Sequence, residues 1–434
     1  MAKTDVLVVG SGPSGLAAAI AAAREGVDTM LVERYGCFGG NITQAMVESI
    51  GWYRHKKTVE SPGIGIEFEA GALKFGGERR EPQSISQVVE ADTFKCVADQ
   101  MVEKAGITKF LHCLGVEALI EGNRVIGVVT ESKEGRQAIL AKRVIDCTGD
   151  ADIAFRAGVA CTHPPKNELE GVTVTFGCSG VNRDLFLAYV LENPGNLGQW
   201  ATETTGKEDK LFSPYLAEPF DLARKNGEIP EDVLTGGTWS SLTDTGEATY
   251  MNMVYMLGLD PTDLKDLTHA EIEGRKQAMA AIAALRKYTP GFKNARLRTF
   301  GSSLGIRESR KIVGRYTMTG DEARNQATFE DSIGIFPEFL DSYGVVIIPT
   351  TGRYFQVPYG IMVPKDMDNI LVAGRCVAGD KMSHAALRQM MCCAVTGQGA
   401  GVAAAVSVKT KTSTQNVSIK TVQDALKKQG VRIK

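Results

Sequence analysis

A glycine pattern near the N-terminus carries the clearest chemical signal in the sequence. It has the form G-x-G-x-x-G at residues 10–15, between an apolar run at residues 5–9 and an alanine-rich segment that ends at Gly26. A strand, this turn and a helix in that order bind the pyrophosphate of a dinucleotide, because glycines admit it to the backbone and the helix N–H groups face its charge. The predicted pyrophosphate site consists of Gly10, Gly12, Pro13, Ser14 and Gly15.

An acidic residue completes this dinucleotide-binding pattern. Glu33 ends a second apolar run, residues 28–32, and lies 18 residues beyond Gly15. A carboxylate at this distance accepts hydrogen bonds from the ribose hydroxyls of the ligand. It also repels a 2′-phosphate, so the pattern disfavours NADP.

The residues that follow Glu33 bear on which dinucleotide binds. Arg34 comes next, and the glycine pair Gly39 and Gly40 precedes Asn41 a few positions later. A glycine pair lets the main chain pass a ligand without Cβ clashes. An acid, a base and a glycine pair in this order resemble the FAD-binding oxidoreductases of the glutathione-reductase structural type. The resemblance implies that Arg34, Gly39, Gly40 and Asn41 contact the cofactor.

Two later segments extend this resemblance. Residues 147–152 are similar to a strand end that passes the adenosine part of FAD in such proteins. Residues 374–380 are similar to a second signature, in which an acid hydrogen-bonds the ribityl hydroxyls. The cofactor contacts implied by these signatures are Thr148, Gly149, Asp150, Gly374, Arg375, Gly379 and Asp380.

The C-terminal half indicates a particular family. With residues 304–319 and 355–364, the chain resembles the FAD-dependent oxidoreductases, whose relatives include the succinate dehydrogenase and fumarate reductase flavoproteins. The resemblance is close over residues 3–160 and 295–408. It implies that a glycine-rich stretch places a helix N-terminus at the N1/O2 edge of the flavin, where reduction puts negative charge. The residues expected there are Gly397, Gly399 and Ala400.

Three polar side chains near these segments are candidates for catalysis. His384 has a pKa near neutrality and suits an acid or a base, although a structural role is an equal alternative. Arg388 suits a carboxylate or enolate oxygen of a substrate, and Tyr359 is a candidate proton donor. Arg307 and Arg310 would share one face of a helix, where they would form salt bridges or bind an anionic substrate.

Composition and charge exclude several classes of protein. The 434 residues include 49 basic and 51 acidic ones, so nucleic acid is not expected as a partner. No apolar run is as long as a transmembrane helix, and residues 1–5 lead into a strand and not a signal peptide. We therefore expect no membrane association and a cytoplasmic location. Nine scattered cysteines without a C-x-x-C pair predict no metal site.

The order of predicted elements gives the fold class. We expect an α/β protein: a Rossmann-type, glutathione-reductase-like FAD-binding domain with an inserted α+β substrate or cap domain. A helix in the insert is predicted over residues 268–287, with a capping box formed by Thr268 and Glu271. The predicted units are residues 1–160 and 296–410 for the FAD-binding domain, 161–295 for the cap domain and 411–434 for a solvated helical tail.

The implied function is flavin chemistry with one dinucleotide. The chain has no second G-x-G-x-x-G domain in mid-chain, and no histidine among its first fifty residues for covalent flavin attachment, so FAD is expected to bind non-covalently. A small organic substrate would then exchange a hydride directly with flavin N5, in dehydrogenation of a C–C or C–heteroatom bond or in reduction of an activated alkene.

Two alternatives stay open at this stage. One is an oxidase or monooxygenase that lets O2 meet the reduced flavin. The other is a partner subunit that binds FAD without turnover of its own. The electron donor or acceptor and the oligomeric state are not predicted by the sequence.

Overall fold

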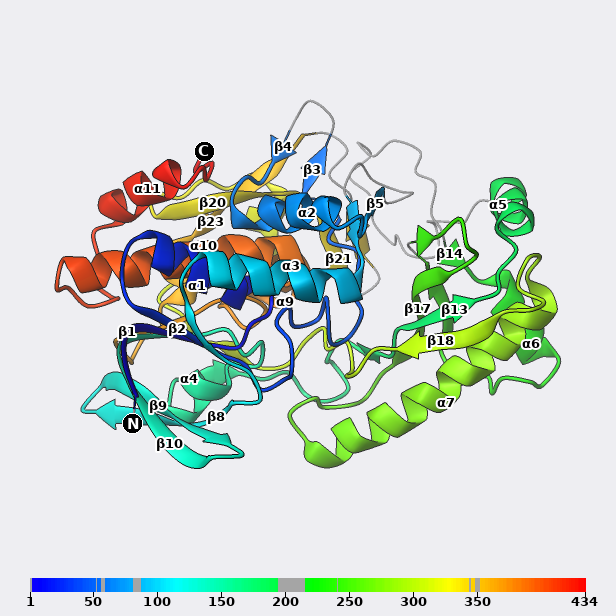
Figure 1. Cartoon of the computed structure of the whole chain (residues 1–434), viewed down its shortest axis with the longest axis horizontal. Helices are drawn as coiled ribbons and strands as arrows, with labels where there is room; N and C mark the ends of the chain where they lie inside the picture. The colour runs from blue at the N-terminus through cyan, green and yellow to red at the C-terminus, as the bar shows by residue number, and fades with distance from the viewer. Residues whose placement is uncertain are drawn as a thin grey trace.

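The computed structural model describes residues 2–51, 53–55, 59–80, 87–193, 215–239, 241–342, 345–347 and 352–434. A large body holds both ends of the chain, and a second lobe, on the right in Figure 1, is formed by the middle of the chain. The helices are α1 Pro13–Arg24, α2 Ile64–Lys74, α3 Ala91–Lys104, α4 Asp152–Arg156, α5 Arg183–Glu192, α6 Glu218–Lys225, α7 Leu264–Tyr288, α8 Gly320–Arg324, α9 Lys381–Leu387, α10 Met390–Lys409, α11 Ile419–Lys428 and the 3-10 helix η2 Tyr359–Met362.

The large body is built on a sheet whose central strand is β1. The order is β7-β2-β1-β10-β9-β8, and β24 also pairs with β10. Strands β7, β2, β1, β10 and β24 run parallel, whereas β9 and β8 are antiparallel. This arrangement confirms the predicted Rossmann-type α/β fold. The strands are β1 Ala2–Val9, β2 Thr29–Val32, β7 Thr108–Phe110, β8 Leu114–Glu121, β9 Arg124–Ser132, β10 Gly135–Asp146 and β24 Ile370–Val372.

The middle of the chain forms a second, mostly antiparallel sheet. Its order is β14-β15-β17-β13-β18, and β12 and β16 both pair with β17. The long helix α7 packs on this sheet through buried alanines and Leu285. The strands are β12 Val172–Thr173, β13 Phe176–Ser179, β14 Tyr215–Leu216, β15 Thr235–Thr238, β16 Ser241–Leu242, β17 Ala248–Met256 and β18 Arg296–Phe300.

Buried apolar side chains form two separate clusters that match these two sheets. The members of the second cluster lie between Val172 and Leu304. The first cluster takes its members from both sides of that range, so the large body is assembled from two distant parts of the chain. Short strands complete the structure: β3 Arg54–His55, β4 Val59–Glu60, β5 Glu78–Arg80, β6 Gln87–Val89, β11 Cys161–Thr162, β19 Lys311–Ile312, β20 Ser332–Pro337, β21 Leu340–Ser342, β22 Val345–Ile347 and β23 Tyr354–Pro358.

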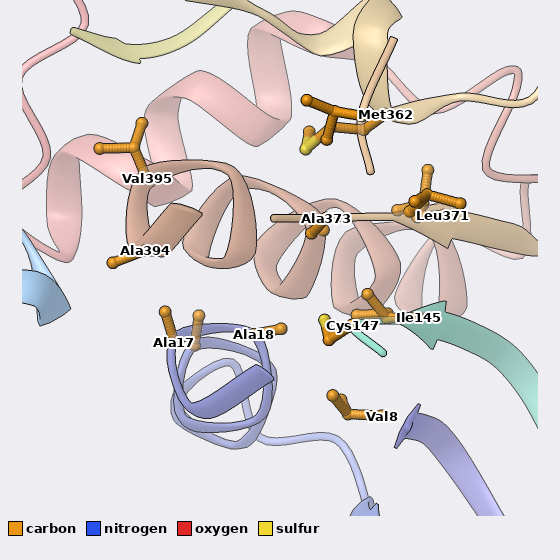
Figure 2. Close-up of a cluster of buried hydrophobic side chains, with 14 of the residues drawn as sticks. Val8, Ala17, Ala18, Ile145, Cys147, Met362, Leu371, Ala373, Ala394 and Val395 are labelled. Carbon is orange, nitrogen blue, oxygen red and sulfur yellow. The ribbon is translucent and has the colours of Figure 1, made fainter. Parts of the chain in front are cut away.

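Helices α1 and α10 cross in close contact at the centre of the large body. Figure 2 shows small side chains, Ala17 and Ala18 of α1 and Ala394 of α10, between the two helices. A Cβ at Gly397 would overlap the backbone of Ser14, so only glycine permits this approach. The expected helix N-terminus at Gly397, Gly399 and Ala400 is not found, because α10 begins at Met390 and these residues lie inside it.

The apolar character of α10 follows from this packing. Among the described helices, α10 alone is long and apolar enough to cross a membrane, but 89% of its most apolar window is buried inside the protein. A core helix that packs against neighbours on all sides is apolar all round.

Helix α7 differs from its prediction in where it begins, and helix α11 differs in having a buried face. Helix α7 begins at Leu264, where Asp263 caps it by accepting hydrogen bonds from the N–H groups of Lys265 and Asp266. The predicted capping box at Thr268 is therefore wrong. Helix α11 in the tail is not fully solvated: Val422 and Leu426 are buried against the large body, and the lysines occupy the exposed face.

Candidate cofactor and substrate cleft

One cleft joins the glycine-rich turn to the inserted lobe. Twelve predicted cofactor contacts line it: Gly10, Gly12, Pro13, Ser14, Glu33, Arg34, Gly40, Asn41, Thr148, Gly149, Asp150 and Arg375. The sequence did not single out most of the other lining residues as site residues, because they come from distant segments. These include Gln44, Cys147, Pro261, Leu267, Glu271, Ser303, Leu304, Ile306, Met390 and Cys393.

The first turn of α1 forms the floor of the cleft near β1. Its N-cap residue, Gly12, offers no side-chain hydrogen bond, and no acidic residue lies in the first turn. The N–H groups and the positive end of the helix are therefore open to an anionic ligand. A Cβ on Gly40 would come within 2.6 Å of Gly12 Cα, so the absence of a side chain at Gly40 lets the two main chains pass in contact beside the turn.

Glu33 is buried and organises the loop next to this turn. Its Oε2 accepts hydrogen bonds from the Ser11 N–H at 2.8 Å and the Ser11 hydroxyl at 2.6 Å. Its Oε1 accepts one from the Tyr35 N–H at 3.0 Å. Each carboxylate oxygen has two lone pairs, so Oε1 still has room for a ribose hydroxyl.

Asp150 is the centre of a buried charged network at the cleft. Arg375 Nη2 lies 2.7 Å from Asp150 Oδ1, which also accepts a hydrogen bond from the Ser309 hydroxyl at 2.6 Å. Burial opposes ionisation of Asp150, but Arg375 and Ser309 outweigh it and hold the pKa of the carboxyl below its ordinary value. Arg310 extends the network by pairing with Asp152 at 2.6 Å.

Eight predicted cofactor contacts do not line the cleft. Asp380 instead caps α9: its carboxylate accepts hydrogen bonds from the N–H groups of Ser383 at 2.7 Å and Gly320 at 3.0 Å. The glycines serve close packing, because a Cβ at each would meet a neighbouring side chain or backbone atom. These eight residues are Gly15, Gly39, Gly374, Gly379, Asp380, Gly397, Gly399 and Ala400.

Two of the three catalytic candidates are also placed elsewhere. His384 is buried and donates from Nε2 to the carbonyl oxygen of Arg307 at 3.1 Å. Burial, reinforced by Lys311 and Arg388, holds the pKa of His384 well below its ordinary value. Tyr359 is buried and donates to the carbonyl oxygen of Thr414 at 2.7 Å, and burial raises the pKa of its phenol. Neither side chain lines the cleft, and each makes a buried hydrogen bond to a main-chain carbonyl oxygen.

A substitution tests this placement of His384. His384→Ala removes a buried hydrogen bond and should lower the free energy of unfolding by about 1–3 kcal/mol. The visible spectrum of bound flavin should stay as in the wild type, because the imidazole does not reach the cleft. Thermal denaturation and absorption spectroscopy measure the two effects. Unchanged stability with an altered flavin spectrum would return His384 to the cofactor site.

Arg388 is the catalytic candidate that lines the cleft. It ends α9, and its guanidinium donates to the Asp341 carbonyl oxygen. Asp341 Oδ2 lies 3.6 Å and Glu170 Oε2 4.0 Å from Arg388 Nη2. Burial raises the pKa of Glu170, while Arg388 and Arg307 oppose that rise. Arg388 is thus a cation at the cleft that two carboxylates approach within 4.0 Å.

The other two arginines of interest have structural contacts. The segment around Arg307 and Arg310 is not helical, so they do not share a helix face as predicted. Arg307 donates to the Gly171 carbonyl oxygen at 3.1 Å and stacks over the ring of Tyr255. These contacts join the inserted lobe to the large body.

Comparison with known proteins identifies the cofactor. A family model described as FAD dependent oxidoreductase matches residues 5–426. The chain belongs to this family. FAD is therefore the cofactor, and the protein is an FAD-dependent enzyme. The open amides of α1, the lining residues Gly12 and Gly40 without side chains, and the buried Glu33 carboxylate fit the pyrophosphate and ribose of FAD.

Curated relatives of this flavoprotein match over part of its length. Thiamine thiazole synthase of Metallosphaera sedula is 33% identical over 161 residues, which are 34% of this chain and 55% of that protein. Digeranylgeranylglycerophospholipid reductase 1 of Methanopyrus kandleri is 32% identical over 165 residues, 36% of this chain and 42% of that protein. The match to these curated relatives thus spans about half of their length.

A solved structure extends the likeness over nearly the whole fold. The geranylgeranyl bacteriochlorophyll reductase-like protein of Thermoplasma acidophilum superposes with a TM-score of 0.53 at 14% identity, covering 98% of this chain and 83% of that one. At this identity the likeness concerns the fold alone.

Within the residues that the structure describes, no group of three or more metal-ligating side chains is present.

Proposed function

We propose that this flavoprotein exchanges a hydride between a small organic substrate and the N5 atom of its FAD. The observation that carries the proposal is the composition of the cleft, which runs from the glycine-rich turn to Pro261, Leu267 and Glu271 of the inserted lobe. The apolar side chains of Leu304, Ile306 and Met390 line the same cleft as the cationic Arg388. A cleft that combines apolar side chains with a few oriented polar or charged groups is typical of a site for a small organic molecule.

The residues of the chain divide the work between cofactor and substrate. FAD, when bound, supplies the two-electron acceptor or donor. Glu33 and the first turn of α1 hold its ribose and pyrophosphate. Arg388 would bind an anionic oxygen of the substrate, such as a carboxylate or enolate, and orient it. The apolar wall would exclude water, which strengthens that interaction by lowering the local dielectric.

The relatives support flavin chemistry in general, and they do not indicate one particular substrate. Two relatives with nearly the same sequence identity to this chain carry different names, a synthase and a reductase. Each match covers about a third of this chain. We infer that the matched part binds a cofactor that these proteins share and that the remainder binds different substrates. We infer that a second partner, an electron donor or acceptor, restores the flavin after each turnover.

Anaerobic bleaching of the flavin tests the proposed reaction. The purified holoprotein is mixed without O2 with small alcohols, amines, hydroxy acids and saturated acids. In the reverse direction, dithionite-reduced protein is mixed with activated alkenes. A compound that bleaches the flavin, or restores its colour, within the time of turnover supports the proposal. If no compound changes the flavin in either direction, the proposed hydride exchange with these classes of small organic substrate is wrong. Rapid reoxidation on admission of air would instead indicate an oxidase or monooxygenase.

Arg388 is the residue whose substitution should affect substrate most directly. Arg388→Gln removes the cation and should lower kcat/KM for an anionic substrate by about 100-fold, or ~2.7 kcal/mol. Arg388→Lys keeps the charge without the planar fork, so it should lose less. Bleaching rates over a range of substrate concentrations measure both variants. Equal rates for the wild type and the Gln variant would remove Arg388 from the substrate site.

A further inference from the structure

The wall of the cleft that faces the inserted lobe is a short non-helical segment, residues 301–306. The N–H groups of alternate residues in this segment donate hydrogen bonds to other elements. Gly301 donates to the Thr175 carbonyl oxygen at 3.1 Å, Ser303 to that of Gln44 at 3.1 Å, and Gly305 to that of Thr173 at 2.8 Å. The strands and loops around it thus hold the wall through backbone acceptors at three points.

The fourth point is held by a side chain. The Leu304 N–H donates to Glu271 Oε1 at 3.1 Å. Glu271 lies on α7 and itself lines the cleft, beside Leu304. Its other oxygen, Oε2, accepts a hydrogen bond from Arg275 Nη1 at 2.9 Å, one turn further along the same helix. The carboxylate is therefore oriented by α7 and aimed at the wall.

We propose that Glu271 is a positioning residue that sets the place of the cleft wall and so controls access to the flavin end of the cleft. Leu304 is almost fully buried, and its neighbour Ile306 also lines the cleft. Without the Glu271 acceptor, the Leu304 N–H has no partner at this position and the wall moves outward to reach water. The inference needs the cofactor and the cleft but no particular substrate.

Paired variants separate this role from a general effect on α7. Glu271→Gln keeps an acceptor oxygen for Leu304 and loses only the ion pair with Arg275. Glu271→Ala loses both contacts. Glu273→Ala is the matched control, because Glu273 pairs with Lys276 at 3.4 Å on the same helix and does not line the cleft.

Two measurements on the FAD-loaded protein test the proposal. Hydrogen exchange resolved to residues 303–306 should be at least about tenfold faster in Glu271→Ala than in the wild type, because the protecting hydrogen bond is gone. The flavin absorption band should lose fine structure and approach that of free FAD, as water enters the cleft. Glu271→Gln should restore both properties to within about threefold of the wild-type exchange rate, and the control should leave both unchanged.

Three outcomes would overturn the proposal. Wild-type exchange at residues 303–306 in Glu271→Ala would show that the wall does not depend on this acceptor. Faster exchange with an unchanged flavin band would show that the wall does not control access to the flavin. Equal loosening in Glu273→Ala would assign the effect to α7 as a whole. A negative result in the substrate screen does not touch these measurements, because they use no substrate.

Discussion

Replacing Glu33 by alanine is expected to raise the Kd for FAD at least about 100-fold, or ~2.7 kcal/mol. Two losses combine in this variant. The ribose loses a charged acceptor, and hydrogen bonds to charged groups contribute about 1.5–3 kcal/mol each. The Ser11 N–H and hydroxyl and the Tyr35 N–H also lose the carboxylate that holds them, so the loop beside the pyrophosphate turn is no longer preformed.

A second variant separates these losses. Glu33→Gln keeps one acceptor oxygen but not the charge, and its amide group presents a donor to Ser11 or Tyr35 where the wild type presents an acceptor. Its Kd should lie between those of the wild type and the alanine variant. Titration of apoprotein with FAD, followed by flavin fluorescence, gives the three constants. An unchanged Kd in Glu33→Ala would mean that the ribose lies elsewhere in the cleft.

The predicted contacts that the structure brings together in one cleft are mostly local in the chain. Strand β1, the turn at residues 10–15, helix α1, strand β2 and Glu33 follow one another within about thirty positions. Their geometry is set by φ preferences at glycine, strand pairing between neighbours and helix capping, which act over short separations. The same reasoning holds for Thr148 and Asp150, which follow directly from the end of β10.

The predicted contacts that lie outside this cleft depend on contacts between distant segments. Gly397 and Gly401 of α10 permit a close crossing with α1, nearly 400 positions earlier, whereas Gly399 packs against Ile333. His384 is near the cleft along the chain, yet α9 turns its imidazole toward the Arg307 carbonyl oxygen. No local pattern reports which way a helix turns a side chain when its partners lie elsewhere.

The inserted lobe was the largest gap in the predicted site. Glu271 matched a capping-box pattern in the sequence, and the structure shows that it holds the cleft wall instead. A carboxylate in a helix serves either purpose equally well. What distinguishes them is the actual start of α7 at Leu264, which places Glu271 two turns inside the helix.

Asp150→Asn should be the most destabilising of the conservative changes at the cleft. The side chains of Asp150 and Arg375 are buried, with exposed fractions of 9% and 13%. Removing one charge leaves the other buried without its partner, and such changes cost about 3–5 kcal/mol in the free energy of unfolding. Asparagine still accepts from the Ser309 hydroxyl, so the lower end of this range is expected. Urea denaturation of the apoprotein at neutral pH measures the loss without contributions from FAD.

The pH dependence and a double variant make this prediction specific. The folded-state pKa of Asp150 lies below its unfolded value of about 3.9. Between these two pKa values the folded state binds fewer protons than the unfolded state, so the free energy of unfolding falls as the pH drops through this interval. The difference in the free energy of unfolding between the wild type and Asp150→Asn should therefore be largest at pH 7 and should shrink below about pH 4. Adding Arg375→Gln to Asp150→Asn should cost less than the sum of the two single changes, because either one already breaks the pair. A difference that stays constant down to pH 3, together with additive single effects, would mean that Asp150 stabilises the fold through its hydrogen bonds and shape and not through its charge.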